Sequence, residues 1–143
     1  MNMTIRQATI FDITIIADLW QKMIEEIETE EFQKEQFFLE TLSAIINPSH
    51  YVVIAEVDGV AIGFISGYIG NMDYMKKPCG IYKYLYVLPQ FRGQGYHENL
   101  IESFAEFCKG KTELLAFMCF PEKSSYWEKR GYKPYKVFMI KEV

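Results

Sequence analysis

The sequence has few of the residues that mark metal centres and disulfide frameworks. It contains only 3 cysteines and 2 histidines in 143 residues, and Cys79, Cys108 and Cys119 form no CxxC pair and no Cys/His pair at metal-ligand spacing. An odd number of widely spaced cysteines predicts reduced thiols that pack as small apolar groups. We therefore expect neither a metal site nor a catalytic cysteine.

Basic residues and long apolar runs are also scarce. The 15 Lys and Arg against 19 Asp and Glu give a net charge of −4, which argues against a general nucleic-acid binder. No apolar run approaches the roughly 18 residues of a membrane span, and no basic segment precedes an apolar one as in a secretory signal. We expect a cytoplasmic protein that binds neither nucleic acid nor membrane.

The chain is instead rich in residues that build a core. Hydrophobic residues make up 50% of it and aromatic residues 16%, which suits one domain over residues 1–143. Periodicity predicts helices at about 12–27, 32–46, 95–109 and 124–130, and strands at 3–10, 51–57, 60–68, 81–88 and 113–120, with one or two more in 132–142. This order, βααβββαβαβ, has no repeat or linker and predicts an α+β domain with a mixed central sheet.

Two short motifs fix local boundaries in this plan. Thr9 and Asp12 have the spacing of a capping box, in which side chains satisfy the first free amides of a helix. Asp58-Gly59 lies between two apolar runs, and such a pair predicts a tight β-hairpin.

Tyrosines dominate the fourth predicted strand. Because side chains alternate along a strand, Tyr82, Tyr84 and Tyr86 are expected on one face. Two interpretations of the tyrosines stay open. They can pack in the core or at the surface, or Tyr68, Tyr74, Tyr82 and Tyr84 can line an aromatic pocket that holds an ammonium group.

The segment after that strand carries the chemistry. A buried strand leads into a turn with Gly93 and Gly95, and the turn opens a helix. Such a turn directs backbone N–H groups outward at the positive end of the helix dipole, and Arg92 adds a guanidinium suited to phosphate. The segment predicts an anion site, best suited to a pyrophosphate. Taken alone, it also fits an ordinary strand–turn–helix junction with a surface arginine.

Several segments, in order, resemble the GNAT superfamily of acyl-CoA-dependent N-acetyltransferases. Ile5 to Asp12 is similar to the family's first strand and helix start, and Val60 to Phe64 to its third strand. Leu85 to Gly95 matches the cofactor pattern (Q/R)-x-x-G-x-(G/A). Tyr126 to Tyr132 is similar to the aromatic–E–K–x–G–aromatic segment near the family's C-terminus. The resemblance covers nearly the whole chain.

The resemblance implies a GNAT-like fold, with six to seven strands flanked by about four helices, and acetyl-CoA as co-substrate. The fourth and fifth strands would splay apart around the pantetheine arm. The backbone that holds this arm would be that of Leu85, Tyr86 and Val87. The pyrophosphate would bind the amides of Arg92, Gly93, Gln94, Gly95, Tyr96 and His97.

Three positions depart from the family pattern. His97 stands where the family keeps a small residue, and we expect a packed imidazole whose charged form the helix dipole disfavours. The position of the family's tyrosine general acid holds Trp127, so Tyr126 is the candidate acid, with core packing as its alternative role. Between Asp73 and Glu98 there is no carboxylate to act as general base on the fourth strand.

Acidic residues gather where the resemblance places the acceptor entrance. Only Lys34 opposes the seven carboxylates at positions Glu25, Glu26, Glu28, Glu30, Glu31, Glu35 and Glu40. They form either a solvated helix face or a field that attracts a cationic amine.

The leading hypothesis is an N-acetyltransferase that transfers an acetyl group from acetyl-CoA to a primary amine, on a small molecule or peptide, by direct attack on the thioester. The alternative is a catalytically degenerate GNAT-like domain that binds CoA or a protein partner. The chain could also form a homodimer.

Overall fold

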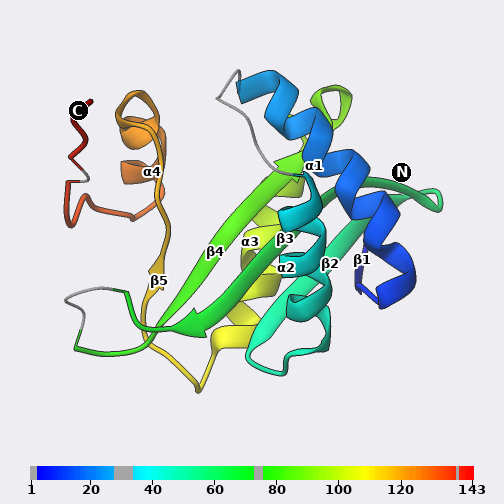
Figure 1. The fold of residues 1–143 in the computed structure, drawn as a ribbon, viewed down its shortest axis with the longest axis horizontal. Helices are drawn as coiled ribbons and strands as arrows, with labels where there is room; N and C mark the ends of the chain where they lie inside the picture. Colours follow the sequence, from blue (N-terminus) through cyan, green and yellow to red (C-terminus); the bar gives the residue numbers. More distant parts are fainter. Residues whose placement is uncertain (1–2, 28–33, 73–75, 138) are drawn as a thin grey trace.

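The computed structural model describes residues 3–27, 34–72, 76–137 and 139–143, and it places one sheet between two layers of helices (Figure 1). The strands are β1 (Met3–Gln7), β2 (His50–Val57), β3 (Val60–Gly70), β4 (Cys79–Val87) and β5 (Leu115–Ala116). The α-helices are α1 (Ile13–Ile27), α2 (Lys34–Ile46), α3 (Tyr96–Cys108) and α4 (Ser124–Glu128). Short 3-10 turns cover Ile10–Asp12, Pro89–Phe91 and Pro121–Lys123.

The sheet is mixed, as the sequence predicts, and the α+β class is confirmed. Its strand order is β1-β2-β3-β4-β5. The first four strands are antiparallel, while β5 runs parallel to β4. The predicted hairpin joins β2 and β3, where Asp58 and Gly59 both have positive φ (52° and 77°). Among the described residues, no helix combines the length and apolar character needed to span a membrane.

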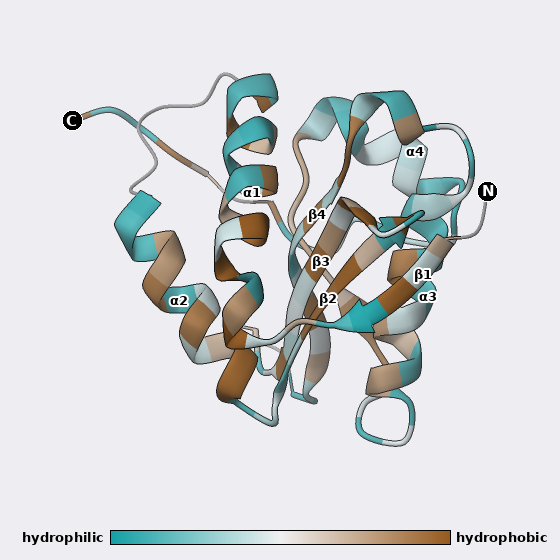
Figure 2. Ribbon diagram, turned by 90° about the vertical axis from the view of Figure 1, so that its right-hand side faces the viewer, coloured by the Kyte–Doolittle hydropathy of each residue, from teal (hydrophilic) through white to brown (hydrophobic). Residues whose placement is uncertain are grey.

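Helices cover the two faces of the sheet and pack apolar side chains against it. Figure 2 shows α1 and α2 on one face and α3 on the other. On the first face, Trp20 stacks on Phe37 (ring centroids 4.3 Å apart), and Phe37 meets Tyr84 edge-on. On the second face, Phe104 of α3 is fully buried and meets Tyr82 edge-on. Burial of such aromatic rings supplies much of the stabilisation of each layer.

The capping box forms and is tied to the sheet. Asp12 accepts hydrogen bonds from the backbone N–H of Thr9 (2.8 Å) and from both Nη atoms of Arg6 (2.8 Å each). Arg6, on β1, also donates through Nε to Glu56 of β2. Asp12 is nearly buried, so its charge is stabilised by these donors rather than by water. The cluster therefore fixes the entry of α1 against the edge of the sheet.

A β-bulge in β4 overturns the prediction that its three tyrosines share a face. Ser66 of β3 pairs with Tyr84, but the next residue, Gly67, pairs with Tyr82, so Lys83 is extra. An inserted residue changes the face on which the side chains before it lie. Tyr82 consequently packs on the α3 face, while Tyr84 contacts α2 on the opposite face. Alternation fails here because it assumes an unbroken ladder.

The C-terminal part has less strand than the sequence predicts. The strand expected over 113–120 is limited to Leu115–Ala116, and no described residue within 132–142 lies in a strand. The order observed is therefore βααβββαβα, with five strands rather than six or seven. The apolar pattern of this segment suits a strand, but its side chains find no cover: Val137, Met139 and Ile140 are 81–84% exposed. Without a neighbouring strand to accept its backbone bonds, the pattern alone forms none.

Replacing Asp12 with Asn should destabilise the fold in a pH-dependent way. The Arg6 hydrogen bonds lower the pKa of the Asp12 carboxyl from 3.8 to about 2, so the charged form stabilises the folded state by about 2 kcal/mol. This contribution is fully present above pH 3.8 and is lost as the pH falls towards 2. Urea unfolding at several pH values should show that the wild type has a larger free energy of unfolding than Asp12→Asn. This difference should shrink as the pH falls from 3.8 towards 2.

The exposed Asp18 of α1 provides the control. Asp18→Asn should change the free energy of unfolding little at any pH. An equal loss in the two variants would contradict the role assigned to the Arg6–Asp12 pair.

Candidate functional site

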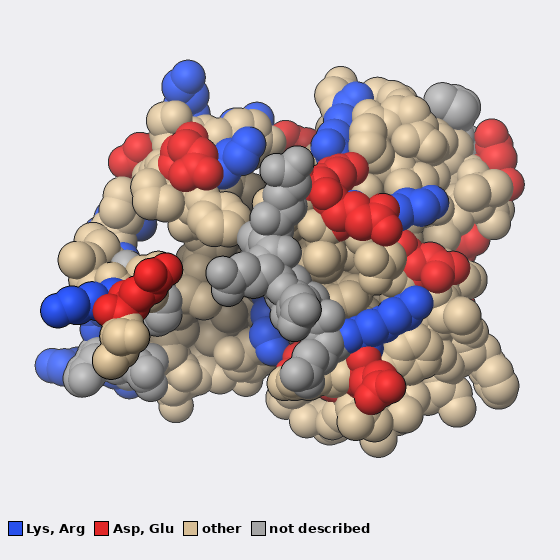
Figure 3. All heavy atoms as spheres, turned by 45° about the horizontal axis from the view of Figure 1, so that its top comes forward, with Lys and Arg blue, Asp and Glu red and all other residues tan. Residues whose placement is uncertain are grey.

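The strands β4 and β5 part soon after they meet. Their pairing includes only Gly80 with Leu115 and Ile81 with Ala116, after which the chain beyond β5 diverges towards α4 (Figure 1). In the space-filling view, the surface is hollowed between the part that carries α4 and the part that carries α1 (Figure 3). The splayed arrangement implied by the sequence resemblance is therefore present.

The open side of β4 presents backbone groups to this hollow. Leu88 donates its N–H to Ile62 of β3 (2.8 Å). In an antiparallel ladder such bonds recur at every second residue, so Tyr86 also faces β3, while the backbone groups of Leu85 and Val87 face away from it. Because β5 pairs only with the first part of β4, these groups have no strand partner in the part of the chain that the structure describes. Of the three predicted pantetheine contacts, Leu85 and Val87 thus lie on the open side, where their contact with a ligand stays a prediction. The prediction for Tyr86 is wrong, because its backbone groups face β3.

The turn before α3 presents a run of free backbone amides. Gly93 and Gly95 have φ values of +76° and +85°, and a Cβ built at either one meets nothing within 4 Å. The amide of Arg92 donates to Pro89, and the first amide bonded within α3 is that of Asn99, to Gly95. Among the described residues, we find no acceptor for the N–H groups of residues 93–98. This geometry can bind an anion at the positive end of the helix.

The Arg92 guanidinium is engaged within the protein. Its Nε donates to the Val87 carbonyl (2.9 Å), and its Nη2 donates to Glu26 of α1 (2.7 Å). The guanidinium also lies 5.5 Å from the centre of the Tyr86 ring. The predicted contact of this group with a phosphate stays a prediction, and it would require Arg92 to exchange Glu26 for the ligand.

Glu26 contacts both Arg92 and Tyr86, and the sequence analysis predicted neither contact. One carboxylate oxygen accepts from Arg92, and the other accepts from the hydroxyl of Tyr86 (2.8 Å). Partial burial opposes ionisation of Glu26, but these two donors leave its pKa below the usual value. Burial and the Glu26 charge raise the pKa of Tyr86 to about 12. An ionised carboxylate with both oxygens engaged is a poor general base and a good structural anchor.

His97 lies partly buried at the start of α3, as expected. Burial lowers the pKa of its imidazole, and the nearby Arg92 charge lowers it further. Neutral His97 is thus favoured, with burial as the main cause rather than the helix dipole alone. A neutral ring at this position neither repels nor attracts an anion strongly, and its backbone amide belongs to the free run of residues 93–98.

Tyr126 and Trp127 occupy different environments. Tyr126 is 41% exposed, and the Arg130 guanidinium covers its ring at 3.6 Å, so it does not pack in the core. Trp127 packs edge-on against Phe117 (4.6 Å) and Tyr132 (5.7 Å). Nothing in these contacts assigns a proton-transfer role to Tyr126, which remains a candidate from the sequence.

The carboxylates of α1 and α2, where the sequence resemblance places the acceptor entrance, are partly neutralised. Glu40 of α2 pairs with Lys83 on the bulge of β4 (3.2 Å), and Glu26 pairs with Arg92. Figure 3 shows acidic and basic side chains interspersed on this face. Lys34 is therefore not the only basic residue that opposes the acidic run. Three of its members, Glu28, Glu30 and Glu31, lie outside the described residues.

The predicted aromatic ammonium pocket does not assemble from its described members. Tyr82 faces α3, whereas Tyr84 faces α2. Tyr68 stacks on His50 at a centroid distance of 5.3 Å. Tyr74 lies outside the described residues. The bulge in β4 is the physical reason, because it separates Tyr82 from Tyr84. Of the cysteines, Cys79 and Cys108 are buried as expected, while Cys119 is exposed and does not pack in the core.

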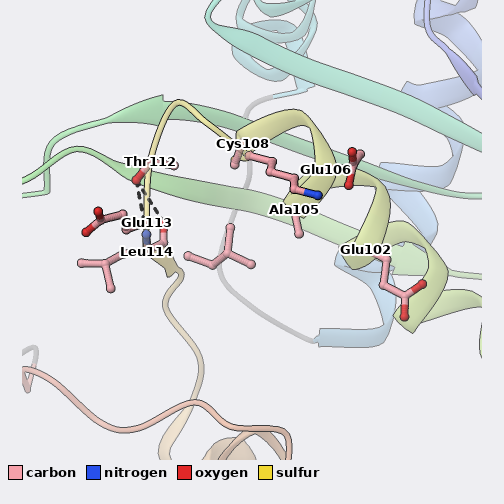
Figure 4. A pocket seen from close by; sticks show the side chains of 9 residues that line it. Glu102, Ala105, Glu106, Cys108, Thr112, Glu113 and Leu114 are labelled. Atoms are coloured by element: carbon pink, nitrogen blue, oxygen red, sulfur yellow. Dashed lines mark hydrogen bonds between the residues drawn. The ribbon is translucent and has the colours of Figure 1, made fainter.

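A cavity of about 570 Å³ lies elsewhere, between the C-terminal half of α3 and β5. It contains none of the predicted binding residues. Figure 4 shows the carboxylates of Glu102, Glu106 and Glu113 pointing away from one another. Since these groups do not converge, the cavity forms no cation site, and the turn before α3 remains the better candidate.

The chain matches known acetyltransferases. A family model described as the Acetyltransferase (GNAT) family matches residues 14–132. A protein of Archaeoglobus fulgidus named an uncharacterized N-acetyltransferase is 33% identical over 66 residues, which are 46% of this chain and 45% of that protein. The match thus spans less than half of that relative's length.

Solved structures share the fold. A GCN5-related N-acetyltransferase from Ralstonia eutropha has a TM-score of 0.82 at 18% identity, with 99% of each chain covered. Glucosamine-6-phosphate N-acetyltransferase from Arabidopsis thaliana has a TM-score of 0.74 at 19% identity, again with 99% of each chain covered. The aminoglycoside N-acetyltransferase AAC(6')-Iy, in complex with CoA, has a TM-score of 0.81 at 20% identity, with 99% of this chain and 95% of that chain covered. At these identities the likeness shows the fold alone.

Replacing Gly95 with Ala should weaken acetyl-CoA binding at least ~10-fold, because a Cβ at a positive φ strains the turn and occupies its open side. Gly59→Ala is a matched control: Gly59 has φ +77° and equal free space but lies in the β2–β3 hairpin. Both variants should lose about 1 kcal/mol of folding free energy. Calorimetric titration should show the affinity loss only in Gly95→Ala, and equal affinities would reject the anion-binding turn.

Replacing Glu26 with Gln should disturb ligand binding more than stability. The Arg92 pair is about two-fifths exposed on both sides, so its loss should cost no more than about 1 kcal/mol. Acetyl-CoA affinity should nevertheless change several-fold, because Arg92 would lose the partner that holds it beside the turn. Glu25→Gln, at an exposed neighbouring position, should leave affinity unchanged. A Glu26→Gln variant with wild-type affinity and thermal stability would show that the contact has no role.

Proposed function

Because the chain belongs to the Acetyltransferase (GNAT) family, we propose that it transfers an acetyl group from acetyl-CoA to a primary amine of a small molecule or peptide. The observation that carries this proposal is the run of free amides at residues 93–98 beside the unpaired edge of β4. These two features fit the two halves of one ligand. The amides suit a pyrophosphate, and the strand edge suits the amide groups of an extended arm.

The residues present fit acetyl-CoA as a substrate. The arm would bind the backbone of Leu85 and the N–H of Val87, since the Val87 carbonyl already accepts from Arg92. The turn carries no side chain at Gly93 or Gly95 that blocks a phosphate. An open-edge N–H of β4 can also donate to the thioester carbonyl and stabilise the charge that develops there.

The acetyl transfer is proposed to be direct, without a covalent enzyme intermediate. The amine forms a bond to the acetyl carbon, and the bond from that carbon to sulfur breaks. A free lysine-like amine has a pKa of ~10.4, so it must first lose a proton, which water in the hollow can accept. Holding the amine and thioester together supplies much of the acceleration, so no carboxylate base on β4 is required.

The acceptor is proposed to be a cationic amine that enters beside α1 and α2. The exposed carboxylates of Glu25 and Glu35 lie on these helices, and attraction by such groups weakens as salt rises. The pairing of Glu26 and Glu40 with basic residues limits the size of this field. One structural neighbour is named an aminoglycoside N-acetyltransferase, which makes aminoglycosides a reasonable class to test.

The alternative is a domain that binds CoA without turnover. The observation that favours it is the indole of Trp127 in the position of the family's acid, where it packs against Phe117 and Tyr132. An indole N–H is not a useful acid at neutral pH. This alternative predicts the same CoA binding but no release of thiol.

The test is an acetyl-transfer assay over a panel of a polyamine, an aminoglycoside, an amino-sugar phosphate and a peptide with a free N-terminus. The expected result is thiol release that depends on the amine, with a product heavier by one acetyl group in mass spectrometry. Gly95→Ala serves as the binding-deficient control. Saturable acetyl-CoA binding without turnover of any amine would favour the alternative, and absence of binding would reject both functions.

A further inference from the structure

An aromatic cluster closes the narrow end of the gap between β4 and the chain that follows β5. Tyr82 is the first β4 residue beyond the last pair with β5. Its ring stacks on Phe117 (4.6 Å) and lies 6.5 Å from Trp127, and Phe117 meets Tyr132 edge-on at 5.1 Å. These four residues come from three separate segments, so the cluster joins the α4 region to β4.

Two hydroxyl groups meet inside this apolar cluster. Tyr82 donates a hydrogen bond to the Tyr132 oxygen at 3.2 Å. Tyr82 is only 4% exposed, and burial strongly raises its pKa, so this residue keeps the proton that it donates to Tyr132. Tyr132 must then direct its own O–H elsewhere, and it is only partly buried. Among the described residues, no acceptor for the Tyr132 proton is found.

The other candidate proton donors are less well placed. Trp127 carries only an indole N–H. Tyr126 touches Trp127 (5.0 Å), but its ring is covered by Arg130 and is outside the four-residue cluster. Cys119 is exposed. Tyr132 is therefore the one described hydroxyl of the cluster whose proton is both unassigned and partly accessible.

We propose that Tyr132 is the general acid of the transferase, and that Tyr82 is a positioning residue that holds the Tyr132 oxygen. The inference rests on the proposed function. It assumes that the arm of CoA enters the gap beside the turn at the N-terminal end of α3 and that its sulfur lies near the narrow end, where β4 and β5 pair. When the carbon–sulfur bond breaks, sulfur keeps the electron pair. Tyr132 gives it the hydroxyl proton, and the Tyr82 hydroxyl stabilises the resulting phenolate.

The proton balance closes through water. The amine releases one proton to solvent before it attacks and a second one as the neutral amide forms. The Tyr132 phenolate regains one proton from solvent after CoA is protonated, so the reaction releases one proton overall. No oxidant, metal or further reactant is needed. The bulge at Lys83 is what makes the pair possible, because it turns Tyr82 to the face on which Tyr132 lies.

The experiment compares Tyr132→Phe, Tyr82→Phe and Tyr135→Phe, all of which keep the ring and should fold. Tyr132→Phe should lower kcat for the best amine of the panel by ~100-fold and leave acetyl-CoA affinity unchanged. Tyr82→Phe should lower kcat less, by roughly ten-fold. Tyr135→Phe, at a position 65% exposed and outside the cluster, is the control and should retain wild-type kcat. Wild-type turnover by Tyr132→Phe would overturn the proposal while the transferase function stands.

A second readout does not depend on the amine. The thiol of bound CoA can be titrated through the ultraviolet absorbance of its thiolate, in wild type and in Tyr132→Phe. A hydroxyl that donates to the sulfur stabilises the thiolate, so the thiol should titrate at higher pH in Tyr132→Phe. Tyr135→Phe, at a position 65% exposed, should leave the titration unchanged. Identical titrations in wild type and Tyr132→Phe would overturn the proposal, as would the absence of CoA binding, which also rejects the proposed function.

Discussion

The geometry of this protein depends on how β4 is paired along its two edges. On one edge, the extra residue Lys83 interrupts the ladder with β3. On the other, pairing with β5 stops after Ile81. The bulge determines which face each tyrosine occupies, and the early end of pairing leaves the backbone groups of Leu85 and Val87 without a strand partner among the described residues. Because an unpaired buried or half-buried backbone group is costly, this edge favours any ligand that supplies the missing bonds.

The same strand connects the two sides of the candidate site. Tyr86 reaches Glu26 of α1, and Glu26 holds Arg92 beside the turn that opens α3. Helix α1 and the turn before α3 are thus linked through one ionised carboxylate, whose charge is stabilised by its two donors.

Local features of the fold could be predicted where the physical cause is local. The Thr9–Asp12 capping box, the Asp58-Gly59 hairpin and the strand–turn–helix that contains Gly93 and Gly95 all form. Each depends on groups a few residues apart. The prediction that the β4 tyrosines share one face was wrong, because one inserted residue reverses the alternation of side chains. Nothing in the tyrosine pattern indicates such an insertion.

Contacts over long sequence distances could not be predicted. Glu26 and Tyr86 are 60 residues apart, and Tyr82 and Tyr132 are 50 apart. In the sequence, Glu26 is one of seven acids in a run, and nothing distinguishes it from Glu25. The prediction of a C-terminal strand was wrong for a related reason. Apolar alternation allows a segment to form a strand, but the strand forms only where another strand lies close enough to bond with its backbone.

The sequence by itself determined the composition of the core, the class of the fold and the position of the glycine turn before α3. These follow from periodicity and from the conformational freedom of two glycines, properties that each segment carries alone. Only the tertiary structure decided that Arg92 is held by Glu26, that Tyr82 leaves the face of Tyr84, and that two hydroxyls meet at the narrow end of the gap. Such contacts depend on the register of distant strands, and a shift of one residue in that register reverses the face of every side chain that follows.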